Sequence, residues 1–382
     1  MSFDFATSID RRQYPTKKWQ QYAEDVLPLW VADMDFRSPP AVIEALHRRV
    51  DHGVFGYADA TPALRDTLCR WSEHHYGWQI DAAWQCWVPG VVPALHLAAL
   101  AFSEPGEGVL TATPIYPPFL SVGRHTGREA QTFELAPPAT PGGDWRLDLD
   151  AMEAAIRPNT RVLLWCHPHN PTGRVWDVDE LRGLAELARR HALIVVSDEL
   201  HCDLILDPER PHQPLGLLCP ELAERLITLW APSKTFNIAG LSAACAVIAD
   251  DTLRERFQRA AAGLLPGVNV LGLHAAEAAY AEGEVWRQAL LTQLRDNLAR
   301  LERHVAGWPG VTLSPPQSTY LAWLDLRGSA LAESPQQRLL EEARVALSDG
   351  ADFGWPGFVR LNFGTPSETL EAALARLDRV LG

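Results

Sequence analysis

The sequence lacks several features that mark particular classes of protein. Its six cysteines are scattered, with no C-x-x-C pair, so we expect reduced, buried thiols in a reducing compartment. No apolar run approaches the roughly 20 residues of a membrane-spanning helix, and an acidic residue stands in Met1–Phe5, where a signal peptide is basic. Positive charge is in deficit, at 34 Lys and Arg against 48 Asp and Glu, which argues against binding nucleic acid or acidic membranes. A cytoplasmic location is therefore expected.

The chain has 382 residues, too many for one compact core of ordinary size and enough for two domains. From about residue 84, short apolar runs typical of strands alternate with helical patterns, of which 177–191 is the clearest. The runs span 109–112, 161–166, 193–197, 226–230 and 243–248. Wholly apolar strands separated by helices indicate an α/β fold with a parallel or mixed sheet covered on both faces. Such sheets bind ligands at the carboxyl ends of their strands.

Other segments flank this region. Ser38 and Thr61 each precede proline and are expected to cap helices, the first with an apolar face that includes Val50. After about residue 275 a smaller α+β unit is predicted, with helices at 285–305, 335–347 and 367–381 and strands at 320–324 and 357–362. We expect an N-terminal arm (1–40) joining a small domain (279–382), and a large domain (41–278).

Four polar residues follow predicted buried strands, where this architecture would gather them: Asn170, Asp198, His201 and Lys234. A desolvated lysine has a lowered pKa and can form a Schiff base with an aldehyde, most simply pyridoxal 5'-phosphate (PLP). Taken singly, each residue also has a simpler interpretation. Asn170 fits an ordinary Asn-Pro turn, Asp198 a strand-end cap beside an incidental His201, and Lys234 a solvated surface charge.

The order and spacing of N-P-T-G (170–173), D-E-L-H (198–201) and S-K-T-F-N-I-A-G-L (233–241) resemble the fold-type I PLP enzymes, the aspartate aminotransferase superfamily. Further stretches resemble the MalY/PatB-type cystathionine β-lyases (C–S lyases), at 29–36, 53–57, 89–95, 113–116, 320–325, 346–350 and 358–362. This resemblance spans nearly the whole chain. It implies a PLP-dependent transferase-like large domain with a central, mostly parallel seven-stranded sheet, plus a smaller α+β domain.

The resemblance also implies roles at the cofactor. Lys234 would form the Schiff base with PLP and later remove the Cα proton of the substrate. Asp198 would pair with the pyridine nitrogen and keep it protonated, which makes the ring an electron sink. Asn170 and His201 would approach the phenolic oxygen, and Tyr116 would stack on the ring.

Contacts to phosphate and substrate are implied in the same way. The N–H groups of Val91 and Val92, at a helix N-terminus, would bind the phosphate together with the Ser233 hydroxyl. Tyr57 would reach the phosphate of a neighbouring subunit, which implies a homodimer with shared active sites. Arg360 would hold the substrate carboxylate. Ala32 and Asn170 would border the same carboxylate, and no metal is implied.

An Arg within the apolar run 357–362 is costly unless paired, which independently favours a functional role for Arg360. Two positions depart from the aminotransferases: Ser242 stands where many have an Arg that binds the phosphate, and Ala231 where many have Ser. The missing Arg favours the lyase branch. We therefore expect a PLP-dependent C–S β-lyase that cleaves cystathionine or a related cysteine S-conjugate to a thiol, pyruvate and ammonia. An aminotransferase is the alternative, and a regulator that binds a transcription factor is a third interpretation.

Overall fold

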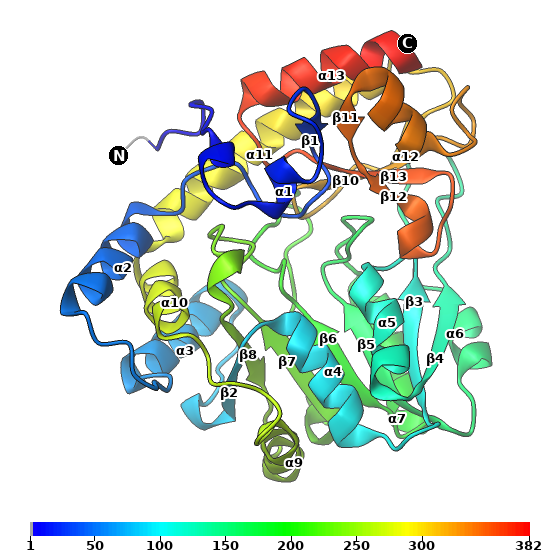
Figure 1. Cartoon of the computed structure of the whole chain (residues 1–382). Helices are drawn as coiled ribbons and strands as arrows, with labels where there is room; N and C mark the ends of the chain where they lie inside the picture. Colours follow the sequence, from blue (N-terminus) through cyan, green and yellow to red (C-terminus); the bar gives the residue numbers. More distant parts are fainter. Residues whose placement is uncertain (1–2) are drawn as a thin grey trace.

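The computed structural model describes residues 3–382, which are arranged around a central seven-stranded sheet (Figure 1). The strand order is β2-β8-β7-β6-β5-β3-β4, and β8 runs antiparallel to both of its neighbours while β3 to β7 are mutually parallel. The strands are β2 (Gln85–Val88), β3 (Gly108–Thr113), β4 (Glu129–Glu134), β5 (Thr160–Cys166), β6 (Ile194–Asp198), β7 (Leu226–Trp230) and β8 (Ala244–Val247). The prediction of a mostly parallel seven-stranded sheet is confirmed.

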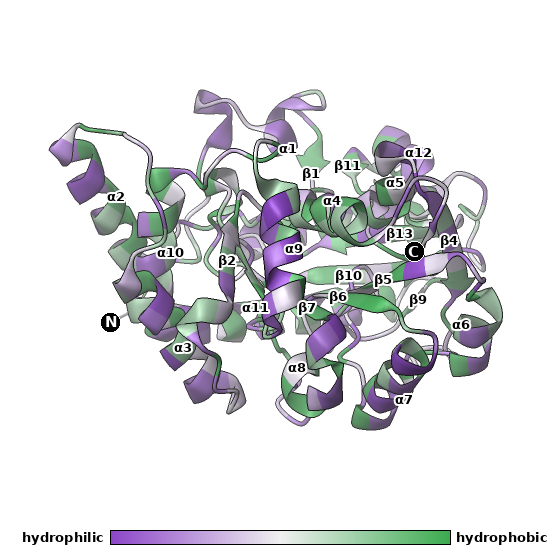
Figure 2. Ribbon diagram, turned by 90° about the horizontal axis from the view of Figure 1, so that it is seen from below, coloured by the Kyte–Doolittle hydropathy of each residue, from purple (hydrophilic) through white to green (hydrophobic). Residues whose placement is uncertain are grey.

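Both faces of this sheet are covered by helices. In β5, Leu164 packs into one core with helices α4, α5 and α9, whereas its neighbours Leu163 and Trp165 pack into another with α6, α7 and α8. Because alternate residues enter opposite cores, the strand is apolar from Val162 to Cys166. Figure 2 shows hydrophobic strands β5, β6 and β7 between helices whose outer turns are hydrophilic. These helices are α4 (Val91–Phe102), α5 (Pro117–Thr126), α6 (Leu149–Ala155), α7 (Val178–Arg190), α8 (Leu215–Leu218) and α9 (Asp251–Ala261).

The C-terminal third builds a second, antiparallel sheet in the order β12-β13-β10-β9. Its strands are β9 (Thr312–Leu313), β10 (Leu321–Asp325), β12 (Ser348–Asp349) and β13 (Phe358–Asn362), with helices α11 (Glu284–Val305), α12 (Pro335–Arg338) and α13 (Ser367–Leu381) beside it. Strand β1 (Leu27–Pro28) of the N-terminal arm pairs in parallel with β11 (Val345–Ala346). The arm therefore lies against the C-terminal elements, as the blue and orange ribbons of Figure 1 show.

Helices α2 (Pro40–His52), α3 (Pro62–Tyr76) and α10 (Val270–Glu282) pack together at one side of the large sheet. Thr61 caps α3 as predicted, accepting the Leu64 N–H at 3.0 Å. The predicted cap at Ser38 is wrong, because the Ser38 hydroxyl instead donates to the Asn237 carbonyl at 3.0 Å. Val50, expected on the apolar face of α2, is 51% exposed.

The helix predicted at 335–347 ends early. After α12 the chain makes a π-helical turn over Leu339–Ala343, and Arg344 then adopts a left-handed conformation with φ of 56°. This reversal releases the chain into β11, whose pairing with the arm outweighs local helix preference. Among residues 3–382, no helix combines the length and apolar character needed to cross a bilayer. The division into an arm and two domains at residues 40 and 278 stays a prediction.

Candidate active site

A cavity of about 200 Å³ lies at the carboxyl ends of the central strands. It is bordered by every residue predicted for the site except Arg360 and Tyr57, namely Ala32, Val91, Val92, Tyr116, Asn170, Asp198, His201, Ser233 and Lys234. Asn170 follows β5, Asp198 ends β6 and Lys234 follows β7. Three neighbouring parallel strands thus deliver the three motifs to one place, as the strand-end rule for α/β sheets requires.

Lys234 lies in the turn after β7 and points to the arm. Its Nζ donates to the Ala32 carbonyl oxygen at 2.7 Å. Burial of the amine lowers the pKa of Lys234 to about 8, and the positive charge of Arg360 acts in the same direction. A substantial neutral fraction near pH 8 makes this lysine a competent nucleophile and base.

Asp198 is buried at the end of β6. One carboxylate oxygen accepts the Leu200 N–H at 3.1 Å. Burial raises the pKa of Asp198 to about 7, against the opposing effects of that hydrogen bond and of Lys234. A buried carboxylate is stabilised by a cationic or protonated partner. Asp198 forms no ion pair with any side chain among residues 3–382.

His201 and Asn170 also border the cavity. Burial lowers the pKa of His201 to about 3, and the charges of Lys234 and Arg360 add to this effect, so its ring is neutral. The Nδ1 atom of His201 is buried without a hydrogen-bond partner in the described chain. The side-chain oxygen of Asn170 accepts from Arg360 Nη1 at 2.9 Å.

The N-terminus of α4 forms another side of the cavity. Gly90 precedes the helix with φ of +117°, a conformation that L side chains rarely adopt. The N–H groups of Val91 and Val92 fall in the first turn, where the helix offers them no acceptor. Ser233 and Ser242 also border the cavity, so a hydroxyl group stands at the position of Ser242, where a phosphate-binding Arg is expected in many aminotransferases.

Arg360 lies on β13, beside the cavity, and is 4% exposed. Besides Asn170, it donates from Nη2 to the Trp30 carbonyl at 3.0 Å and to Ser348 Oγ at 3.3 Å. Its guanidinium lies 4.8 Å from the Phe353 ring centroid. Burial lowers the pKa of Arg360 to about 10, which leaves it cationic at neutral pH, and its Nε is buried with no hydrogen-bond partner among residues 3–382.

The segment Trp30–Asp35 of the arm was expected to contribute only backbone near Ala32, yet it is held to the rest of the site throughout. Its carbonyls accept hydrogen bonds from Arg360 at Trp30, from Asn362 at Val31 and Asp33, from Lys234 and Tyr320 at Ala32, and from Asn237 at Met34. Tyr320, Asn362 and Asn237 were missed as site residues. Their contacts are to main-chain atoms, which leave no mark in a sequence.

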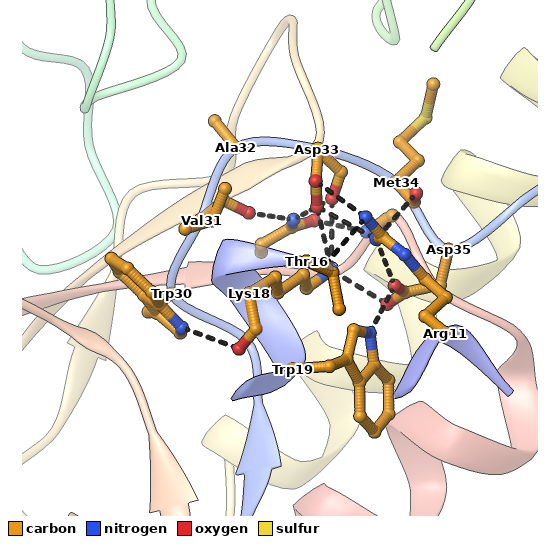
Figure 3. Close-up of polar contacts among 12 residues, drawn as sticks. Arg11, Thr16, Lys18, Trp19, Trp30, Val31, Ala32, Asp33, Met34 and Asp35 are labelled. Carbon is orange, nitrogen blue, oxygen red and sulfur yellow. Dashed lines mark hydrogen bonds and ion pairs between the residues drawn. The ribbon is translucent and has the colours of Figure 1, made fainter. Parts of the chain in front are cut away.

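A charged cluster, formed by Arg11, Lys18, Asp33 and Asp35, holds this segment in place (Figure 3). Lys18, which is 1% exposed, lies 2.7 Å from Asp35 Oδ2 and donates to the Asp33 carbonyl at 3.0 Å. Arg11 donates to both carboxylates, at 2.9 Å to Asp33 and 2.7 Å to Asp35, and Trp19 Nε1 donates to Asp35 at 2.8 Å. With these donors in place the buried charges are compensated.

Tyr57 lies outside the cavity and is fully exposed, as are large parts of Val54 and Phe55 in the same loop. Within one copy of the chain it therefore takes no part in the site. No group of three or more His, Cys, Asp or Glu side chains among residues 3–382 is arranged to hold a metal ion.

Known proteins share both the sequence and the fold. Residues 24–377 match the model of the aminotransferase class I and II family. Cystathionine β-lyase PatB of Bacillus subtilis (strain 168) is 38% identical over 378 residues, which cover 95% of this chain and 96% of that protein. The crystal structure of OvoB superposes with a TM-score of 0.94 at 43% identity, covering 99% of both chains.

The structure of cystalysin from Treponema denticola, which contains a pyridoxal 5'-phosphate cofactor, superposes with a TM-score of 0.94 at 33% identity and covers 100% of this chain and 99% of that one. These similarities extend over nearly the whole chain. The protein belongs to the aminotransferase class I and II family and, within it, to the MalY/PatB-type branch.

Proposed function

We propose that the protein is a PLP-dependent C–S β-lyase that cleaves cystathionine or a related cysteine S-conjugate to a thiol, pyruvate and ammonia. The observation that carries this proposal is the pairing, in one cavity, of a lysine whose pKa falls to about 8 with a buried carboxylate that has no cationic protein partner. The similarity to PatB and to PLP-containing cystalysin supports it.

The residues present fit the cofactor. Asp198 lacks a cationic partner, and a protonated pyridine nitrogen would supply one. The unpartnered Nδ1 of His201 and the amide of Asn170 suit the phenolic oxygen. The free N–H groups of Val91 and Val92 suit a phosphate dianion at a helix N-terminus. The Ser233 hydroxyl would bind the same phosphate, and the Tyr116 ring offers an aromatic face to the cofactor.

When bound, PLP supplies an aldehyde that takes up the amino group of the substrate and a ring that accepts the electron pair of Cα. Arg360 would bind the substrate α-carboxylate through its guanidinium fork, using the unpartnered Nε and an Nη now bonded to a carbonyl or amide. Lys234, as the neutral amine, would remove the Cα proton. The C–S bond at Cβ then breaks as a Cα=Cβ double bond forms, and the sulfur leaves with its electron pair and is protonated to the thiol. The released 2-aminoacrylate is hydrolysed by water to pyruvate and ammonia.

The alternative is transamination, in which the proton returns to the cofactor carbon. Ser242, in place of the phosphate-binding Arg, favours the lyase reaction. Incubation with cystathionine in the absence of any oxo acid should release pyruvate and free thiol. Amino transfer that strictly requires an oxo acid, with no thiol released, would contradict the proposal.

We further propose a homodimer in which Tyr57 completes the site of the partner. Tyr57 is fully exposed within one chain, and Val54 and Phe55 beside it are 62% and 55% exposed, which suits burial against a second copy. Mixing Lys234→Ala protein with Tyr57→Ala protein should restore part of the activity, because heterodimers contain one site with neither substitution. Mixtures that exchange subunits and stay inactive would contradict shared sites.

The expected arrangement of an arm (1–40), a large domain (41–278) and a small domain (279–382) is proposed on the same basis. The pairing of β1 with β11 and the separate four-stranded sheet support it. The cavity would then lie between the arm and the large domain, with Ala32 from the arm and Lys234 from the large domain, while Arg360 of the small domain reaches its edge through Asn170.

A further inference from the structure

Two donors meet at one main-chain oxygen beside the cavity. Lys234 Nζ donates to the Ala32 carbonyl oxygen at 2.7 Å, and the Tyr320 hydroxyl donates to the same oxygen at 3.0 Å. A carbonyl oxygen has two lone pairs, so the two donors occupy both. The strength of the hydrogen bond between Lys234 and the Ala32 oxygen therefore depends on the Tyr320 hydroxyl.

The Ala32 carbonyl is itself fixed and does not follow the lysine. The Asn362 side chain donates to the carbonyls on either side of it, to Val31 at 2.6 Å and to Asp33 at 2.7 Å. The charged cluster around Asp33 and Asp35 also holds this segment in place (Figure 3). Lys234 is consequently the mobile partner in its hydrogen bond with Ala32.

Tyr320 is a fixed donor. It precedes β10, is 1% exposed, and its ring lies edge-on to His201 with centroids 6.2 Å apart. Burial raises the pKa of Tyr320 far above its usual value, so the hydroxyl keeps its proton. Tyr320 does not border the cavity, and its hydrogen bond to the Ala32 carbonyl is the polar contact that links it to Lys234.

We infer that Tyr320 is a positioning residue for Lys234. Because its hydroxyl donates to the same Ala32 carbonyl, the hydrogen bond that holds the Lys234 amine is weak enough for the amine to leave. The inference rests on the proposed function, in which Lys234 gives up its hydrogen bond with Ala32 to react with the aldehyde of PLP and, once the amino group of the substrate has replaced it there, takes the Cα proton. While the lysine is away, Tyr320 keeps the carbonyl hydrogen-bonded. Without the hydroxyl, departure would leave a buried acceptor with no donor, which is costly.

Chemical labelling of the cofactor-free protein tests this role without any turnover. The chain contains three lysines, and Lys17 is exposed and serves as an internal reference. In Tyr320→Phe, Lys234 should be acetylated by trace acetic anhydride about three- to tenfold more slowly relative to Lys17 at neutral pH, since the Ala32 oxygen then serves the ammonium alone and keeps more of it protonated. Mass spectrometry of the two peptides gives the ratio.

Tyr280→Phe is the matched control. Tyr280 is also buried and packs on Phe236, near Lys234, but makes no hydrogen bond with Ala32, so its labelling ratio should equal that of the wild type. Equal labelling of Lys234 in wild type and Tyr320→Phe would overturn the inference, and so would an equal slowing in both variants.

The loaded enzyme gives a second measurement. With PLP bound, Tyr320→Phe should lower kcat and move the acid limb of the pH–rate profile to higher pH, with KM for cystathionine unchanged. A change confined to KM would overturn the inference, because it would place Tyr320 against the substrate. Slower labelling in a protein that cleaves no cystathionine would refute the proposed reaction and still support the positioning role.

Discussion

Replacing Arg360 by alanine should lower kcat/KM for cystathionine about 30- to 5,000-fold. The guanidinium is almost fully buried and would form a bidentate pair with the substrate carboxylate. Truncating one member of such a pair costs about 2–5 kcal/mol, and each 1.36 kcal/mol corresponds to a tenfold change in rate. Part of this cost arises because the Trp30 carbonyl and the Asn170 side chain would each lose a donor.

The charge of Arg360 has a separate effect. It is the second cause, after burial, of the lowered pKa of Lys234. Arg360→Ala should therefore raise the pKa of Lys234 and move the acid limb of the kcat/KM profile to higher pH. Arg360→Lys keeps the charge but loses the fork, so it should lower kcat/KM with little movement of that limb.

Pyruvate release from cystathionine, followed from about pH 6 to pH 10, measures both effects. The control is Arg327→Ala, an exposed arginine after β10 that pairs with Asp325 at 2.7 Å; its kcat/KM should match the wild type. An Arg360→Ala protein with the kcat/KM of the wild type would refute the assignment of the carboxylate site. A profile that does not move would refute the coupling between Arg360 and Lys234.

Other substitutions test the remaining parts of the site. Lys234→Ala should abolish turnover and the visible absorbance of the bound cofactor while circular dichroism stays unchanged; full activity would refute the mechanism. Asp198→Asn should reduce kcat at saturating PLP by about a hundredfold or more, because an amide cannot stabilise positive charge on the ring; a kcat equal to the wild type would exclude that pairing. Lys18→Met should lower the free energy of unfolding in urea by about 3 kcal/mol at neutral pH, because the buried Asp35 loses its nearest cation, whereas the exposed Lys17→Met should change it little. Burial raises the pKa of Asp35, but Lys18, Trp19 and Arg11 together outweigh burial and leave that pKa lowered. The stabilisation should therefore be lost as the pH falls through the lowered pKa, and a difference between the variants that persists at acid pH would contradict it.

The sequence predicts the centre of the sheet better than its margins. Strands β3, β5, β6, β7 and β8 are buried on both faces, so each is built mainly of apolar residues. Strand β4 lies at the sheet edge and alternates, with Glu129, Ala130 and Thr132 at least partly exposed and Gln131 and Phe133 buried, which gives no such run. Strand β2 has only four residues. Strands that are short, or buried on one face only, lack the continuous hydrophobic pattern that identifies a core strand.

The site shows the same contrast. Asn170, Asp198 and Lys234 follow core strands, so their convergence can be predicted from the α/β architecture. Arg360 could be predicted as functional because a cation within an apolar strand needs a partner. Tyr320 and Asn362 bind carbonyls of Val31, Ala32 and Asp33. No property of a side chain predicts a main-chain partner that lies 288 to 331 positions away in the sequence.

The position of the arm has a consequence for the order of events during synthesis. The ribosome makes Leu27–Pro28 first and their partners Val345–Ala346 near the end, so the arm emerges with its principal contacts still untranslated. The pair between Lys18 and Asp35 spans only 17 residues and could form within the nascent arm itself, at the small loop-closure cost of a local contact. A ribosome-bound chain that ends before Arg360 would therefore carry a folded large sheet and Lys234 but no complete active site, and catalytic competence should appear only when the last strands are released.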